Sequence, residues 1–246
     1  MNGRGWIVLG IVDTCVTAIL KEFPLTPDER EGYASGLSLP WDAEERIKEM
    51  YPRPGAVEEE GEEMLGHYEV IASPGRLVLH LHPLKSFFWH HALDIFRAGY
   101  YIEQSDLRFM CDMVVLKTYT HEQFHHFCDI ARHLFGCRYD RLREEALAVA
   151  WSYFQIEAQR QQWSSKEARL SAGIYRELLP KVFRYSAPCY RDWVNFRLRA
   201  DFEKALIDYT GPHSSSVLGY NGIDMSRVLV KILEETKAQG VIESIE

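Results

Sequence analysis

The sequence lacks several features that would assign it to a common class of protein at once. Its five cysteines are odd in number, and none belongs to a C-x-x-C pair. A disulfide framework and a thiolate zinc site are therefore unsupported, and a reducing, cytoplasmic location is favoured. The apolar run at residues 5–20 is interrupted by Asp13 and followed by no small-residue cleavage site. It predicts a buried N-terminal helix or strand rather than a signal peptide or a membrane span.

Clustered positive charge is also missing. Lys and Arg number 28 against 36 Asp and Glu, which gives a net charge of −8, and no basic stripe stands out. The sequence therefore predicts no nucleic-acid partner. It also predicts no membrane partner, because the apolar run at residues 5–20 is too short and too polar to span a bilayer. Apolar residues make up 46% of the chain and aromatic residues 13%, which allows a substantial core and excludes a disordered composition. The oligomeric state is left open.

Hydrophobic periodicity indicates a mainly α (α+β) fold, with residues 1–246 forming a single domain. Residues 21–66 are polar, acidic and rich in loops, with a short helix near 41–50. Residues 67–82 predict an antiparallel hairpin, because two β-rich runs flank the turn-forming triplet Ser73-Pro74-Gly75. Residues 84–246 are mostly helical.

Three details of the helical part can be checked against the structure. A helix is predicted from about residue 106 to Phe135 and ends at Gly136, although the β-branched residues at 118–120 leave a break open. Residues 188–209 predict another helix. Residues 210–224 predict a loop by composition, followed by a terminal helix at 225–239.

One of these predicted helices contains the residues with the clearest potential to bind a metal ion. His121-Glu122-Gln123-Phe124-His125 matches the pattern H-E-x-x-H. On a helix, residues four apart lie on the same face, so His121 and His125 can bind one ion together. Glu122 is rotated to the side of that site, where it can deprotonate a water molecule without being a ligand.

A catalytic zinc ion needs a third protein ligand and an open fourth position. Glu144 and Glu145 lie on the next predicted helix, after a turn at 136–140. A helix–turn–helix brings the second helix back alongside the first, so a carboxylate from this pair can face the two imidazoles.

H-E-x-x-H followed by a glutamate some twenty residues later resembles the gluzincin class of zinc metallopeptidases. The string Glu144-Glu145-Ala146-Leu147-Ala148 is similar to the one that carries the third ligand in that class. The resemblance implies Zn²⁺ bound by His121, His125 and Glu145, with Glu144 as the alternative ligand. In that class a strand beside the helix commonly pairs with extended substrate, which makes the predicted hairpin a candidate wall of the cleft. The other interpretation is that His80 and His82 lie on an exposed polar face of the strand.

The sequence departs from the gluzincin pattern at one position. Many gluzincins carry an aspartate four residues after the third ligand, which orients a zinc-binding histidine, and Val149 occupies that position here. Another group must therefore hold the imidazole of His121. An oxyanion donor is also expected. Tyr190 is the first candidate, and the others are Tyr185, Arg191 and His213.

Together these residues predict a zinc-dependent metallopeptidase that acts on a peptide or protein. Glu122 would be the general base and Tyr190 the oxyanion donor. The alternative is a non-catalytic helical module for protein–protein interaction, whose metal site is structural or vestigial.

Overall fold

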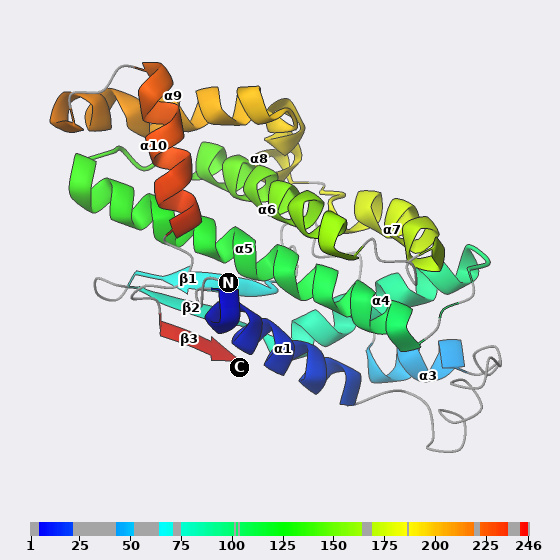
Figure 1. Cartoon of the computed structure of the whole chain (residues 1–246). Coiled ribbons are helices and arrows are strands. Elements are labelled where there is room, and N and C mark those ends of the chain that lie inside the picture. Colours follow the sequence, from blue (N-terminus) through cyan, green and yellow to red (C-terminus); the bar gives the residue numbers. More distant parts are fainter. Residues whose placement is uncertain are drawn as a thin grey trace.

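The chain folds into helices packed beside a small sheet, as the sequence predicted (Figure 1). The computed structural model describes residues 5–21, 43–51, 64–70, 75–100, 102, 104–163, 169–185, 187–218, 222–235 and 242–245. The helices are α1 (Gly5–Lys21), α3 (Ala43–Met50), α4 (Leu81–Arg97), α5 (Gln104–Phe135), α6 (Arg141–Trp163), α7 (Arg169–Val182), α8 (Pro188–Arg191), the 3₁₀ helix η1 (Asp192–Phe196), α9 (Arg199–Leu218) and α10 (Gly222–Glu235). The strands are β1 (Gly66–Glu69), β2 (Arg76–Leu79) and β3 (Ile242–Ile245).

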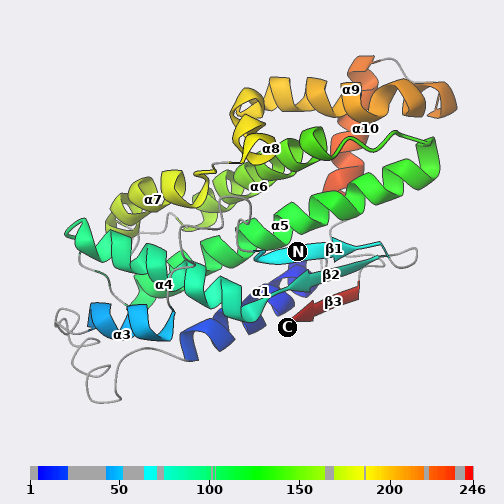
Figure 2. The same ribbon diagram turned by 180° about the vertical axis from the view of Figure 1, so that it is seen from behind.

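Helix α5 lies at the centre of the fold. It contacts α1, α4, α6, α7 and α9, and also strands β1 and β2. Figures 1 and 2 show it running between α6 on one side and the sheet with α1 on the other. Any side chain on α5 that faces both α6 and β1 is therefore held by elements on two sides.

Helix α5 is continuous through residues 118–120, where a break was left open. The Thr118 hydroxyl donates to the carbonyl of Val114 at 3.1 Å, and the Thr120 hydroxyl donates to that of Leu116 at 2.8 Å. These bonds satisfy the hydroxyl groups inside the helix. The helix ends as predicted, because Gly136 adopts the left-handed conformation with a φ of 66°.

The sheet differs in part from the prediction. Strands β1 and β2 form the expected antiparallel hairpin, with Gly66 opposite Leu79. Strand β3 was not predicted, and it pairs parallel to β2, which makes a three-stranded sheet. Three residues of β2, Leu77, Val78 and Leu79, are all fully buried. Helix α5 packs against β2, and β3 lies on its other edge.

The C-terminal part also corrects two predictions. The helix expected at 188–209 is divided into α8, η1 and α9. The loop expected at 210–224 is wrong for residues 210–218, because α9 continues to Leu218. The Thr210 hydroxyl is buried and donates to the carbonyl of Leu206 at 2.8 Å, and α9 packs along α10. Tertiary packing therefore overrides the loop-like composition of this segment.

Two buried apolar clusters hold the helices together. One joins α1, α4, α5 and α7, and the other joins α5 and α6 to α9 and α10. In the second cluster Trp151 of α6 stacks on Phe202 of α9 with ring centroids 6.1 Å apart. Burying each such side chain stabilises the fold by about 1.5–3 kcal/mol. The two clusters therefore fix α5 and α6 against each other along their length.

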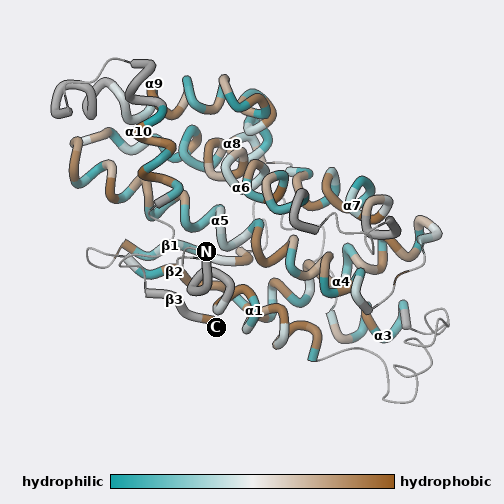
Figure 3. The backbone as a smooth tube through the Cα atoms, viewed as in Figure 1, coloured by the Kyte–Doolittle hydropathy of each residue, from teal (hydrophilic) through white to brown (hydrophobic). Residues whose placement is uncertain are grey.

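Hydrophobic and hydrophilic residues alternate along the helices (Figure 3). Within the described part of the chain, no helix combines the length and the apolar character that crossing a bilayer requires. The predicted short helix near 41–50 is present as α3. Most of the acidic segment at 21–66, including Glu58–Glu63, lies outside the described residues.

Candidate metal centre

The turn between α5 and α6 determines which side chains meet. Gly136 ends α5, and α6 begins five residues later at Arg141. The Asp140 carboxylate accepts a hydrogen bond from the backbone N–H of Arg143 at 3.2 Å and so caps the start of α6. This short connection makes α6 antiparallel to α5. The first turn of α6 therefore faces the second half of α5, where the H-E-x-x-H motif lies.

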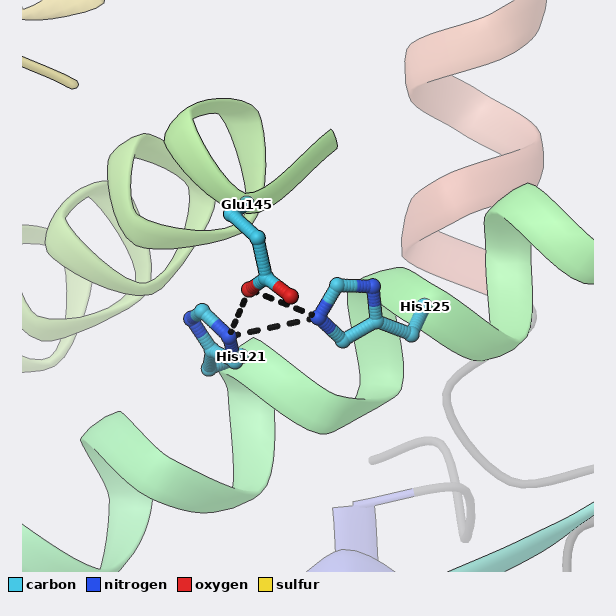
Figure 4. A group of neighbouring side chains, drawn as sticks. All are labelled: His121, His125 and Glu145. Carbon is cyan, nitrogen blue, oxygen red and sulfur yellow. Dashed lines mark hydrogen bonds and ion pairs between the residues drawn. The ribbon is translucent and has the colours of Figure 1, made fainter. Parts of the chain in front are cut away.

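His121, His125 and Glu145 converge on one point (Figure 4). The Nε2 atoms of His121 and His125 are 3.2 Å apart. Glu145 Oε2 lies 3.1 Å from the first of these nitrogens and 3.3 Å from the second. These three side chains form the cluster that can bind a metal ion.

The size of this triangle fits a tetrahedral ion. Donors that bind zinc at about 2.0–2.1 Å with tetrahedral angles lie roughly 3.3 Å from one another. The three measured separations, 3.1, 3.2 and 3.3 Å, match that edge length. The residues present therefore fit a metal ion held on one triangular face, with its fourth position facing away from the three ligands.

Glu144, the alternative ligand, has a different position. Its Oε1 lies 2.9 Å from Nδ1 of His125, the ring nitrogen that points away from the cluster. Its Oε2 accepts hydrogen bonds from Arg132 and from the Tyr209 hydroxyl, both at 2.5 Å. A carboxylate bonded to the far nitrogen of a ligating imidazole fixes the orientation of the ring and raises its basicity. Glu144 thus orients a ligand rather than contributing one.

A carboxylate does hold one histidine of the motif, but it is not at position 149. Val149 is fully buried in the apolar core and reaches no ligand. Glu144 orients the second histidine of the motif, whereas the gluzincin pattern led us to expect a partner for the first. His121 is instead held by packing, because the Tyr190 ring lies 5.9 Å from its own at an angle of 31°.

Tyr190, the first candidate for an oxyanion donor, lies beside His121. It lines the same cavity as the cluster and stacks on Tyr185 with centroids 5.4 Å apart. Lys117 lies 4.8 Å above the Tyr185 ring and fastens this pair of tyrosines to α5. Tyr185 and Arg191 are absent from the cavity wall among the described residues. His213 falls in α9, but its side chain lies outside what the structure describes.

Glu122 lies beside the cluster and is open to the cavity. It is 7% exposed and lines the cavity together with His121 and His125. Among the described residues it forms no hydrogen bond or ion pair. A sheltered carboxylate that faces a cavity can accept a proton from a water molecule held there.

The cavity has a volume of about 460 Å³ and lies between the cluster and strand β1. Gly66, His67 and Tyr68 of β1 form part of its wall, so one strand of the hairpin borders the cavity. The Tyr68 hydroxyl donates to Asp129 of α5 at 3.0 Å and accepts from the Gly75 N–H at 2.9 Å. These bonds fasten β1 to the helix that carries the motif.

Burial and hydrogen bonding shift the charges of the ligands. Burial alone lowers the pKa of His125, but hydrogen bonds to Glu144 and Glu145 outweigh it and raise the pKa to about 10. Burial alone raises the pKa of Glu145, but hydrogen bonds from His121 and His125 outweigh it and hold the pKa well below its usual range. Without a metal, a protonated His125 therefore pairs with ionised carboxylates.

This arrangement predicts that metal affinity rises with pH. The raised pKa means that His125 keeps its proton from acid pH up to about pH 10, and a metal must displace that proton to bind. Apparent affinity should increase about tenfold per pH unit between pH 6 and 8 if one proton is released. Competition with a chelating dye at each pH measures this, and calorimetry in two buffers of different ionisation enthalpy counts the proton. An affinity independent of pH would contradict the prediction.

Sequence reasoning missed most of the residues around the ligands. Tyr209 and Arg132 hold Glu144, and Tyr68 ties β1 to the helix. Tyr209 is 65 positions from Glu144 in the sequence, and Tyr68 is 61 positions from Asp129. No local pattern marks such pairs. The one available signal was the adjacency of two glutamates, which was interpreted as a choice between ligands.

Comparisons of the chain with protein-family models, with curated proteins and with solved structures found no match.

Proposed function

We propose that the protein is a zinc-dependent peptidase. The observation that carries the proposal is the triangle of two imidazole nitrogens and one carboxylate oxygen, with sides of 3.1, 3.2 and 3.3 Å. Two histidines and a glutamate form a donor set that zinc peptidases use, and the separations suit tetrahedral zinc. The H-E-x-x-H motif adds a carboxylate at the position of a general base.

The open side of the triangle supports catalysis over a structural role. Structural zinc sites are closed by four protein ligands, whereas catalytic sites keep one position for water or substrate. Here three ligands border a cavity of about 460 Å³. The alternative, a protein-interaction module with a structural or vestigial metal site, gives no reason for this opening.

Each side chain around the cavity has a separate role in the proposed hydrolysis of a peptide bond. Zinc held by these ligands acts as a Lewis acid and makes water more acidic. Glu122 accepts a proton from the attacking water and delivers it to the leaving nitrogen as the C–N bond breaks. Tyr190 donates a hydrogen bond to the oxygen on which negative charge develops. Glu144 keeps His125 in the tautomer whose Nε2 faces the ion.

Metal analysis and a cleavage assay test the proposal together. We expect purified protein to contain about one zinc per chain and to cleave members of a randomised peptide library. A chelator should remove both the zinc and the cleavage, and stoichiometric zinc should restore both. Full cleavage after complete removal of metal would contradict the proposal. Zinc at one per chain without any cleavage would favour the interaction module.

A further inference from the structure

One end of the cavity carries positive charge that the proposed chemistry does not use. Beyond His125 the wall continues through Glu144 and Arg132, and the Arg132 guanidinium lies 5.2 Å from the Tyr139 ring. Arg141 lines the same cavity. Tyr190 is at the opposite end, against His121. The cleft therefore has one end beside Tyr190 and another end that carries the guanidinium groups of Arg132 and Arg141.

The two guanidinium groups at this end differ in what they bind. Arg132 is engaged, since it donates to Glu144 at 2.5 Å and lies 3.9 Å from the Asp129 carboxylate. Arg141 is exposed and forms no hydrogen bond or ion pair with any residue that the structure describes. Its donors are open to a ligand in the cavity.

None of the three carboxylates of the described cavity wall forms an ion pair with Arg141, and the third of them, Glu122, lies beside the two histidines of the motif. Glu144 is matched by Arg132, Tyr209 and His125, and Glu145 is matched by the two histidines or by a metal ion. A planar guanidinium with free donors binds carboxylates through two parallel hydrogen bonds. The charge at this end of the cleft is therefore complementary to an anionic group of a substrate.

We propose that Arg141 binds a carboxylate of the substrate within about two residues of the bond that is cleaved. This inference rests on the proposed peptidase function. Arg141 and Glu145 are one helical turn apart on α6, which places their Cβ atoms about 5–6 Å from each other. An extended peptide advances about 3.3 Å per residue, so one or two residues span that separation.

Two sources can supply such a carboxylate. One is an aspartate or glutamate side chain at a fixed position, and the other is the free C-terminus of the substrate. A randomised decapeptide library prepared both as the C-terminal acid and as the C-terminal amide separates them. A side-chain carboxylate gives the same acidic preference in both libraries. A terminal carboxylate confines cleavage to the last two bonds of the acid library, and amidation abolishes it.

The experiment reads cleavage and binding separately. Cleavage sites are identified by mass spectrometry with zinc-loaded wild-type protein. Binding is measured as the peptides that the immobilised Glu122→Gln protein retains from the same libraries. We expect carboxylate-bearing peptides to be preferred roughly fivefold at low salt, with a smaller preference at high salt, because Arg141 is exposed and screened.

Three variants test whether Arg141 causes the preference for carboxylate-bearing peptides. Arg141→Gln should remove the preference in both readouts, and Arg141→Glu should convert it into a preference for Lys and Arg. A merely structural role of Arg141 would not invert the preference. Arg138→Gln is the matched control, because Arg138 is an exposed arginine of the same turn and is absent from the described cavity wall. It should keep the wild-type preference.

The outcomes for the two proposals are distinct. Cleavage without any carboxylate preference, or with a preference that survives Arg141→Gln, would overturn the inference and leave the peptidase function standing. Absence of cleavage in every library would count against the peptidase function. The retained peptides would then still decide whether Arg141 selects carboxylates.

Discussion

Replacing Glu122 with glutamine is expected to lower the rate of peptide cleavage by about 10²–10⁴-fold, the usual contribution of a general base. Glutamine has nearly the same shape as glutamate but cannot accept a proton at neutral pH. Glu122 is not one of the three clustered donors, so the variant should bind zinc as wild type does. Steady-state cleavage of one identified peptide and metal content of the same preparation measure both effects.

A matched control separates this effect from a general loss of carboxylates. Glu177 of α7 pairs with Lys181 on the same helix and is absent from the described cavity wall. Glu177→Gln should retain wild-type cleavage and metal. Undiminished cleavage by a zinc-loaded Glu122→Gln protein would show that the assigned mechanism is wrong.

Glutamine at position 145 is expected to have a much larger effect on metal binding than glutamine at position 144. Glu145 Oε2 lies 3.1 and 3.3 Å from the Nε2 atoms of the two histidines. The Glu145→Gln substitution therefore removes a negatively charged donor from the metal ion itself. The Glu145→Gln protein should no longer retain one zinc per chain through gel filtration. Glu144→Gln should retain it with an affinity about 10–100-fold weaker, as is typical when the partner of a ligating histidine is removed.

Affinity measured with a chelating dye ranks the wild type, Glu144→Gln and Glu145→Gln. Circular dichroism confirms that each variant is folded, which matters because Glu144 is 2% exposed and also binds Arg132 and Tyr209. Tyr209→Phe removes only one hydrogen bond from Glu144 and should weaken the site less than Glu144→Gln. A ranking in which Glu144→Gln loses metal and Glu145→Gln keeps it would assign the third ligand to Glu144 instead.

The helices that carry the site could be predicted because their signals are local. The spacing of His121 and His125 places both on one helix face, and Gly136 marks where that helix turns back. The two glutamates follow directly in the next helix. A local string was also sufficient to favour Glu145 over Glu144, and the structure places Glu145 in the cluster.

Predictions failed where packing partners are distant in the sequence. Strand β3 pairs with β2 across more than half the chain, as Arg76 lies opposite Ile242, and no turn signal announces a parallel pair. Residues 210–218 have the composition of a loop, but α9 remains helical where it packs along α10. Propensity is a weak prior that tertiary contacts override.

The sequence by itself determined which residues form the cluster, since helical periodicity and a short turn suffice to bring two imidazoles and a carboxylate together. Only the tertiary structure decided what surrounds them. It placed Glu144 behind His125, Tyr190 beside His121, and part of β1 in the wall of the same cavity. The physical reason is that the spacing of the two histidines is set within one turn of helix. The orientation, burial and charge of the clustered side chains depend instead on residues that are distant in the sequence and are brought close by packing.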